Sequence, residues 1–438
     1  MVRLGPIELA DGVTRGHART LLFAAFTTIG LLVFVGVATP YVLNVHLGVP
    51  LDEQGRVSGH LVMWTEITQL ATFTLFGVVA DRIGRRQVFA LGYVVMALGY
   101  ALYPYAGSTG ELTVYRILYA LGVSAATCML ATVVSDYPRE QSRGRMVTLV
   151  GICNGLGIVA LTVVFGRLPK WLTEAGYDAV TAGRWTLLIV AAAALVSGLI
   201  VARGLKPGLE VRREERPSIG HLLRAGFTAM RNPRITLAYS AAFVARGDLV
   251  ILGTFTNLWG QAAVFAAGGT GADAMAQGKT LFVVAQIAAL PWAGIAFFLI
   301  DRFNRVAGLA LCMGLAAIGY LSIRIVSDPL AGATLPLFAL LGIGQISAFL
   351  GATALIGQEA PVAERASVVA MFSFFGAVGI LVTSLAGGYL YDHAGPEAPF
   401  VMIGFLNLIV LAAALLVRRY APGRPRRITL PRPEREGL

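Results

Sequence analysis

Charged residues are scarce in this chain. Asp, Glu, Lys and Arg together make up only 13% of its 438 residues, whereas hydrophobic residues make up 56%. A soluble domain carries about 25% charged residues, so this composition excludes an ordinary soluble protein. The mean hydropathy of +0.72 indicates instead a chain that lies in lipid.

Cysteine and histidine are also rare. Cys128, Cys153 and Cys312 lie inside apolar runs, and their odd number implies no disulfide framework. None stands near a histidine at metal-ligand spacing, so we expect no metal site. The sequence has neither the clustered His, Cys or paired Asp of a membrane enzyme nor the G-x-x-x-x-G-K-[ST] loop of nucleotide-driven transport. We therefore expect neither an enzyme nor a cofactor.

What the sequence does have is a series of apolar runs, each long enough to cross about 30 Å of hydrocarbon as a helix. The first is too long for a signal peptide and lacks a small-residue cleavage site after it, so we predict a retained helix. The twelve predicted spans are 20–43, 59–80, 87–105, 113–135, 146–166, 184–204, 235–260, 280–300, 307–326, 333–356, 368–391 and 399–417. The fold class predicted is an all-α membrane protein.

The net charge of +11 would suggest nucleic acid in a soluble protein, but here the basic residues are distributed by loop. The even-numbered short loops carry Arg82, Arg85, Arg86, Arg139, Arg143, Arg145, Arg302, Arg305 and Arg365. The odd-numbered loops carry only Arg56, Arg167, Lys170 and Lys279. The positive-inside rule then places the even-numbered loops and both termini in the cytoplasm. We expect a multi-pass protein of the inner (plasma) membrane that does not bind nucleic acid.

The middle of the chain breaks the apolar pattern with a dense run of charges. We predict an N-terminal bundle over 1–204, a cytoplasmic linker over 205–233, a C-terminal bundle over 234–420 and a basic cytoplasmic tail over 421–438. A weak amphipathic pattern over 219–231 predicts a helix on the cytoplasmic membrane surface.

The two halves resemble each other at an offset of about 220 residues. Asp81-Arg82 recurs as Asp301-Arg302, and Arg143 followed by Gly157-Ile158 recurs as Arg365 followed by Gly379-Ile380. Repeats of this kind predict two pseudo-symmetric six-helix bundles, with a substrate site between them near the bilayer midplane.

One motif is diagnostic. The segment between the second and third spans reads Gly77-Val-Val-Ala-Asp81-Arg82-Ile-Gly84-Arg85-Arg86 and resembles the G-x-L-a-D-R-x-G-R-K signature of the major facilitator superfamily of secondary transporters. A glycine near a helix end permits close approach, and the arginines can exchange ion-pair partners. The resemblance implies that this segment latches the halves together on the cytoplasmic side. It assigns the gate to Gly77, Asp81, Arg82, Gly84, Arg85 and Arg86.

Further loop charges join this predicted gate. The loop after the fourth span contains Asp136, Glu140 and Arg143, similar to the family's acid-then-basic loop, and we expect Asp136 or Glu140 to pair with Arg85 or Arg86. The second half keeps Asp301 and Arg302, with Asn304 in place of a glycine. The alternative is that these charges are solvated and only fix the topology.

A second motif is a partial match. Arg116-Ile-Leu-Tyr119-Ala120-Leu-Gly122 resembles the family's R-x-x-Q-G-x-G pattern, with Tyr119 in place of Gln and Ala120 in place of Gly. The resemblance implies a role for Arg116 in proton coupling or charge balance. An equal alternative is that Arg116 extends to the outer membrane surface.

Ionisable residues inside predicted spans are functional candidates, because burying a charge in the membrane is costly. Arg246 and Asp248 lie near the middle of the seventh span, and Glu66 lies in the second. We predict that Arg246 binds an anionic substrate group or balances a titrating acid, the alternative being a structural ion pair. We predict that Asp248 faces a neighbouring helix and that Asp248 or Glu66 carries the coupled proton.

Other polar residues complete the predicted substrate site. Tyr239, Arg246 and Asn257 recur at helical spacing on one face of the seventh span, which we predict to line the central cavity. Gln286 and Gln345 are further candidates for hydrogen bonding to substrate, although contacts between helices would explain them equally well.

These observations favour a secondary active transporter of a small organic solute that bears a negative or polar group. We expect transport to be coupled to protons or another ion and to proceed by alternating access. We expect it to act as a monomer in the lipid bilayer. One alternative is a drug efflux antiporter, although the fifth span reads Gly151-Ile-Cys-Asn154-Gly155-Leu-Gly157 and lacks the G-P-x-x-G-G element of that group. The other is a scaffold of the same fold that transports nothing.

Overall fold

The computed structural model describes residues 2–208, 219–302, 304–361 and 364–421. Within them, twelve helices are long and apolar enough to cross a membrane, which confirms the predicted spans. The spans of the first half are built on α1 (Arg15–Tyr41), α2 (Gln54–Ile83), α3 (Arg85–Leu102), α4 (Thr109–Asp136), α5 (Arg143–Phe165) and α7 (Ala179–Gly204). Those of the second half are built on α9 (Pro233–Ala266), α11 (Thr280–Arg302), α12 (Arg305–Ser322), α13 (Leu335–Glu359), α14 (Arg365–Ala394) and α15 (Ala398–Tyr420).

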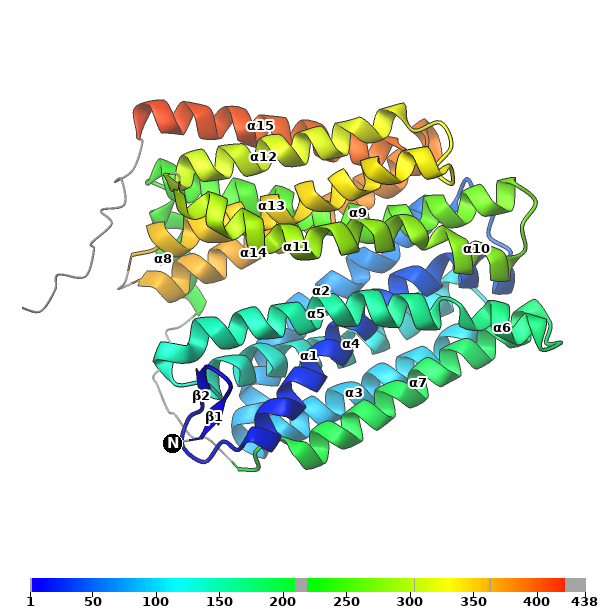
Figure 1. The fold of residues 1–438 in the computed structure, drawn as a ribbon, viewed down its shortest axis with the longest axis horizontal. Helices are drawn as coiled ribbons and strands as arrows, with labels where there is room; N and C mark the ends of the chain where they lie inside the picture. Colours follow the sequence, from blue (N-terminus) through cyan, green and yellow to red (C-terminus); the bar gives the residue numbers. More distant parts are fainter. Residues whose placement is uncertain (1, 209–218, 303, 362–363, 422–438) are drawn as a thin grey trace, which may run out of the picture.

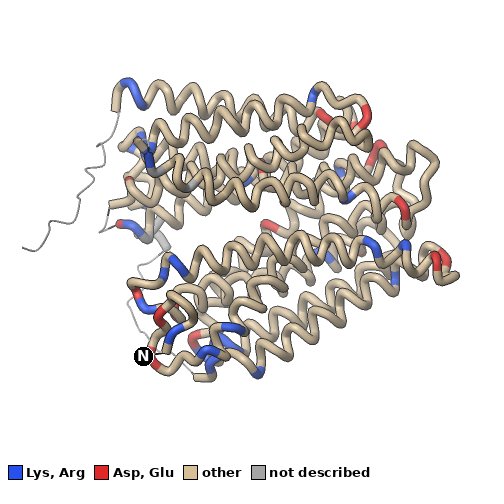
Figure 2. The backbone as a smooth tube through the Cα atoms, in the orientation of Figure 1, with Lys and Arg blue, Asp and Glu red and all other residues tan. Residues whose placement is uncertain are grey.

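The helices form two bundles that lie side by side, with α1 to α7 in one and α9 to α15 in the other (Figure 1). We call the end that carries the N-terminus and α8 (Ile219–Ala229) the terminal end, and the opposite end, with α6 (Leu168–Glu174) and α10 (Gly271–Gly278), the far end. Charged residues gather toward both ends, and the middle of the molecule carries few of them (Figure 2). This distribution is that of a protein whose middle lies in hydrocarbon.

The two bundles repeat one close helix contact. A Cβ atom added at Gly157 of α5 would overlap the backbone carbonyl of Phe26 in α1. One added at Gly379 of α14 would overlap the carbonyl of Phe243 in α9 in the same way. Only a residue without a side chain permits this approach, so the repeat seen in the sequence has a structural counterpart.

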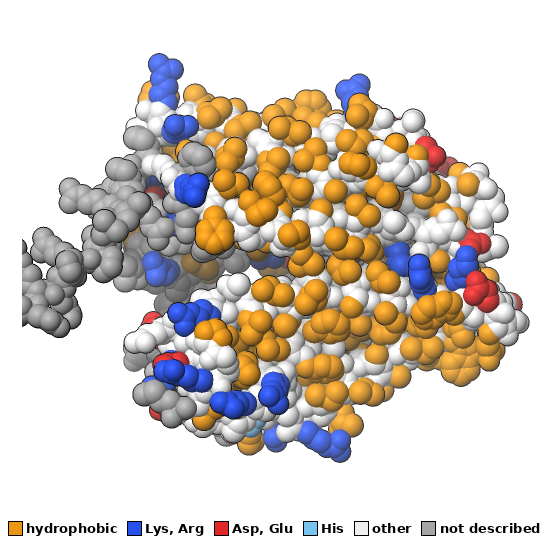
Figure 3. Space-filling model, in the orientation of Figure 1, with side chains coloured by type: hydrophobic (Ala, Val, Ile, Leu, Met, Phe, Trp, Pro, Cys, Tyr) orange, Lys and Arg blue, Asp and Glu red, His pale blue; other side chains and the backbone are white. Residues whose placement is uncertain are grey.

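The bundles pack together toward the far end and separate toward the terminal end. A Cβ at Gly155 of α5 would meet Leu290 of α11, whereas one at Gly151, one turn nearer the terminal end, would meet no atom within 4 Å. A Cβ at Gly294 of α11 would likewise meet no atom within 4 Å, and one at Gly77 of α2 would meet only Cys128 of its own bundle. Figure 3 shows a notch between the halves at this end. We call the space between the separating helices the wedge.

Several small elements were not predicted. A hairpin of β1 (Arg3–Leu4) and β2 (Ile7–Glu8) precedes α1, and α6 and α10 extend the loops at the far end. Two-residue strands and short helices that adjoin apolar runs give no periodic signal of their own. The predicted linker helix is present as α8 and packs on α14, where a Cβ at Gly226 would meet Met371. Residues 209–218 of the linker and 422–438 of the tail lie outside the described part.

Candidate transport site and gates

Two opposite charges lie near each other in different bundles. Glu66 comes from α2 and Arg246 from α9, both near mid-depth of their helices and both only partly buried. They lie close enough for their charges to interact across the seam between the bundles. No direct ion pair joins them in the described part of the chain. The two charges therefore interact through space without a direct contact.

The remaining neighbours of Arg246 fix its position. Its Cζ atom lies 5.6 Å from the ring centroid of Phe349 on α13, a cation–π distance. Its Cγ atom lies against Gly376 of α14, so that a Cβ there would come within 2.7 Å. The glycine packs against the aliphatic part of the side chain and the aromatic ring lies by the guanidinium, whose N–H donors have no hydrogen-bond partner among the described residues.

The other two residues of the predicted face of α9 make contacts within their own bundle. Tyr239 is buried, stacks on Phe375 at 5.2 Å between ring centroids, and donates its hydroxyl to the carbonyl of Gly226 at 3.3 Å. Asn257 is fully buried and donates to the carbonyl of Gly253 at 2.7 Å. In this conformation, therefore, the structure does not bring Tyr239 and Asn257 together with Arg246 at the wedge.

The two glutamines predicted for substrate binding belong to neighbouring helices of the second bundle. Gln286 on α11 is half-buried and Gln345 on α13 is buried. Neither side chain has a hydrogen-bond partner among the described residues. Close packing of Gly342 against Ala285 joins the two helices at this level. Both amides therefore have hydrogen-bonding capacity that a ligand could use.

Asp248 faces α15, in agreement with the expectation that it points toward a neighbouring helix. It is 0% exposed, and Asn407 of α15 donates its amide to both carboxyl oxygens, at 3.0 and 3.3 Å. Tyr320 of α12 donates to the backbone carbonyl of Asp248 at 2.6 Å. The Asn407 carbonyl oxygen is buried without a partner, so a protonated Asp248 has an acceptor beside it. The sequence reasoning missed Asn407.

Arg116 lies inside the first bundle. It is 6% exposed, so the alternative that it extends to the membrane surface is wrong. Its Nε donates to the Thr65 hydroxyl at 2.8 Å, its Nη1 reaches that of Thr39 at 3.5 Å, and its Cζ lies 5.4 Å from the ring centroid of Tyr119. The hydroxyl and aromatic groups of α1, α2 and α4 draw the guanidinium inward because they satisfy its donors.

The predicted gate residues lie at the terminal end, and several of them form ion pairs within the first bundle. Arg85 pairs with Asp136, which confirms one of the expected pairings, and Arg143 lies 3.8 Å from Glu140. Gly84 links α2 to α3 with a φ of 102°, a conformation that favours glycine. Asp81, Arg82 and Arg302 are exposed, Arg86 is half-buried, and the side chain of Asp301 lies outside the described part.

The hairpin before α1 holds the gate loop in place. Ala10 N donates to the Tyr137 carbonyl at 2.8 Å, and Arg139 N donates to the Glu8 carbonyl at 2.9 Å. Glu8 N also donates to the Ser142 hydroxyl at 3.0 Å. The loop that carries Asp136 is therefore fixed by backbone contacts to a segment that the sequence reasoning left unassigned.

At the far end, an acid of one bundle caps a helix of the other. The carboxylate of Asp392 in α14 accepts from the backbone N–H groups of Gly55 at 2.8 Å and Arg56 at 2.7 Å, in the first turn of α2. These N–H groups have no partner within the helix, and the helix dipole favours a negative charge beside them. Gly59 and Ser384 continue this close contact between α2 and α14.

The short helices add a second far-end connection. Lys170 of α6 forms an ion pair with Asp273 of α10 at 3.0 Å. Lys279, only 4% exposed, donates to the Ala276 carbonyl at 2.8 Å and packs against Gly166. Gln261 of α9 donates to the Val37 carbonyl of α1 at 2.8 Å. These contacts join the bundles on the side opposite the wedge.

No group of three or more His, Cys, Asp and Glu side chains within the described residues could hold a metal ion. Two helical bundles that are closed at one end and separated at the other, with an acid and an arginine from different bundles near mid-depth, define a polytopic membrane transport protein.

The comparisons with known proteins agree with this class. The family model described as Major Facilitator Superfamily matches residues 21–275 and 271–436. The chain therefore belongs to the major facilitator superfamily, a family of transporters.

Among its relatives is the magnetosome protein MamH of Paramagnetospirillum magneticum, 26% identical over 434 residues, which are 94% of this chain and 95% of MamH. The magnetosome protein MamZ of the same organism is 25% identical over 86% of this chain, and the match spans only 59% of MamZ. The crystal structure of the nucleoside transporter NupG has a TM-score of 0.71 at 15% identity, over 92% of this chain and 99% of NupG. This likeness shows the fold alone.

Proposed function

We propose that the protein is a secondary active transporter of a small organic solute with an anionic group, coupled to protons and working by alternating access as a monomer. The observation that carries the proposal is the placement of Glu66 and Arg246, which come from different bundles and lie close enough for their charges to interact. Charges at this depth are costly in a membrane and mark substrate or ion pathways.

The two charges suggest how substrate and proton are coupled. A substrate carboxylate that binds the Arg246 guanidinium takes the place of Glu66 as its counter-ion. Glu66, without its cationic neighbour and still partly buried, then gains a proton more readily. One anion and one proton would be carried together, so the step would be electroneutral. Asp248, enclosed by α9, α12 and α15, is a second candidate for the proton site.

Alternating access would close the terminal end and open the far end. The arginine distribution favours a cytoplasmic terminal end, which would make this conformation inward-open in the inner membrane, with both termini in the cytoplasm. The contacts of Asp392 and Lys170 would then close the outer side. When the terminal end closes, the segment from Gly77 to Arg86 would approach the second bundle, and the Arg85–Asp136 pair would be free to exchange partners.

The first prediction concerns binding. Arg246→Lys is expected to lower solute uptake by about tenfold or more, because lysine cannot form the two-pronged contact of a guanidinium with a carboxylate. Uptake of a panel of labelled organic anions by proteoliposomes measures the effect, and Arg324→Lys, at an exposed far-end arginine, is the matched control. Equal loss in both variants contradicts a substrate role for Arg246. A lack of flux for the entire panel in the parent protein favours the scaffold alternative.

The second prediction concerns coupling. Glu66→Gln is expected to abolish accumulation driven by an imposed pH gradient while solute counterflow continues, because an amide keeps the shape of the neutral acid and cannot release a proton. Asp248→Asn makes the same test of the second acid. The variant that loses accumulation identifies the coupling residue. Full accumulation in both single variants and in the double variant would exclude both acids from coupling.

A further inference from the structure

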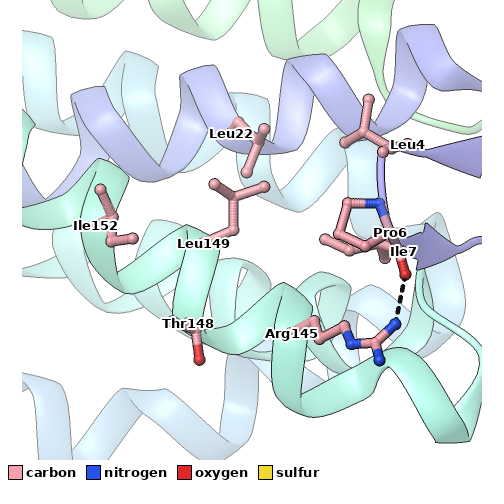
Figure 4. A pocket seen from close by; sticks show the side chains of 9 residues that line it. Leu4, Pro6, Ile7, Leu22, Arg145, Thr148, Leu149 and Ile152 are labelled. Atoms are coloured by element: carbon pink, nitrogen blue, oxygen red, sulfur yellow. Dashed lines mark hydrogen bonds between the residues drawn. The ribbon is translucent and has the colours of Figure 1, made fainter. Parts of the chain in front are cut away.

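Two cavities adjoin each other where the N-terminal hairpin meets α1 and α5. The first, of about 510 Å³, is lined largely by apolar side chains, among them Leu22 of α1, Leu149 and Ile152 of α5, and Leu4 and Ile7 of the hairpin segment. We call it the apolar groove. Its volume lies within the range of about 300–1,000 Å³ that is usual for ligand sites. Figure 4 shows Arg145 at one end of it and Ile152 at the other.

The second cavity, of about 280 Å³, is polar and is lined by Arg3, Glu8, Gln141, Ser142 and Arg145 together with Gly5 and Pro6. We call it the polar pocket. It shares Gly5, Pro6 and Arg145 with the apolar groove. The two cavities thus meet at Arg145, and together they form one site with a polar end and an apolar end.

The charges at the polar end favour an anion. Arg3 is neutralised by an ion pair with Glu8 at 2.5 Å. Arg145 donates from Nη1 to the Pro6 carbonyl at 2.8 Å and has no carboxylate partner within the described residues. A guanidinium has five N–H donors, so most of those of Arg145 are available to a phosphate group.

The place of the site along α5 favours a lipid as its occupant. The hairpin and α5 lie on the near face of the molecule in Figure 1, and in Figure 3 this face is covered with apolar side chains between the two charged ends. Arg145 stands in the first turn of α5, and Ile152 lies about 10 Å further along the helix at 1.5 Å per residue. The site therefore extends from headgroup level into the hydrocarbon.

We propose that the hairpin, α1 and α5 form a binding site for an anionic phospholipid, with the phosphate on Arg145 in the polar pocket and an acyl chain in the apolar groove. A lipid bound here would contact the hairpin that holds the gate loop, and it would join that loop to the surrounding leaflet. The site lies at the terminal end of α1 and α5 and does not depend on which solute is transported.

The test uses the purified, delipidated full chain in detergent, with dioleoyl phosphatidylglycerol as the anionic probe and dioleoyl phosphatidylcholine as the zwitterionic one. Native mass spectrometry counts bound lipid, and thermal unfolding measures the stabilisation that accompanies binding. The parent is expected to bind phosphatidylglycerol about tenfold more tightly, because the choline cation of phosphatidylcholine offsets the phosphate charge that Arg145 attracts. Equal binding of the two lipids would overturn the proposal.

Two matched pairs of variants test the two ends of the site. Arg145→Gln is expected to remove the preference for phosphatidylglycerol, whereas Arg19→Gln, at an exposed arginine of α1 outside both cavities, should retain it. Leu149→Trp fills the apolar groove and should weaken binding of both lipids several-fold, whereas Leu156→Trp, an exposed position elsewhere on α5, should not. Each variant must unfold at the parent's temperature before lipid is added. Equal behaviour within either pair contradicts the site.

Discussion

Gly157→Val is expected to prevent the first bundle from folding. The added Cβ would overlap the carbonyl of Phe26 in α1, and a backbone atom inside a helix cannot move aside as a flexible side chain can. The free energy of unfolding should fall by more than the amount of about 1–3 kcal/mol that is usual for overpacking a core. The yield of monodisperse protein and its midpoint of thermal unfolding in detergent measure the effect.

Gly151→Val is the matched control for this prediction. It makes the same substitution in the same helix, with the same change in helix propensity, but a Cβ at Gly151 meets no atom within 4 Å. Gly379→Val should reproduce the loss in the second bundle because it would overlap the Phe243 carbonyl. If Gly157→Val unfolded at the same temperature as Gly151→Val, the close approach of α1 and α5 would be incorrect.

The second large effect is expected at the far end. Asp392→Ala should shift the protein toward a conformation in which that end is open, because it removes the cap that the second bundle places on α2. A hydrogen bond to a charged group contributes about 1.5–3 kcal/mol. Loss of one such bond shifts the equilibrium between the closed and open conformations of the far end by about ten- to a hundredfold. Spin labels on cysteines introduced at Thr109 and Ser327 in a cysteine-free background measure the separation of the bundles there.

Asp178→Ala serves as the control for this shift. Asp178 also caps a helix near the far end, accepting from Thr181 N at 3.0 Å, but both groups belong to the first bundle. Its replacement should cost some stability and leave the label separation unchanged. An unchanged distance distribution in Asp392→Ala, or an equal shift in Asp178→Ala, would exclude Asp392 as a far-end latch.

Some of the candidate site was readable from residue type and position. Arg246 and Glu66 stood out because charges rarely occur in apolar runs, and the structure places the two near each other. The Arg85–Asp136 pair followed from opposite charges in loops that must meet at the same end of one bundle. Such predictions need only the topology of the helices, which hydropathy supplies.

Other parts of the candidate site could be located only from the packing of the helices. Asp392 lies at the end of a span, as many loop acids do. No local pattern indicates that it caps the helix that begins near Gly55, 337 residues away in sequence. The periodicity of α9 grouped Tyr239 with Arg246, yet Tyr239 is enclosed by Phe375 and α8. Arg116 could have faced outward, and only the positions of Thr65 and Thr39 decide that it does not.

The sequence by itself determined the number of spans, the likeness of the two halves and the family motif over residues 77–86, because these depend on local hydropathy, on repeated residues and on a contiguous pattern. The tertiary structure alone decided which charges meet, which end is closed and which polar groups are already used. Those features depend on contacts between helices distant in the chain, whose rotation and tilt are fixed by close packing at positions such as Gly157 and Gly379.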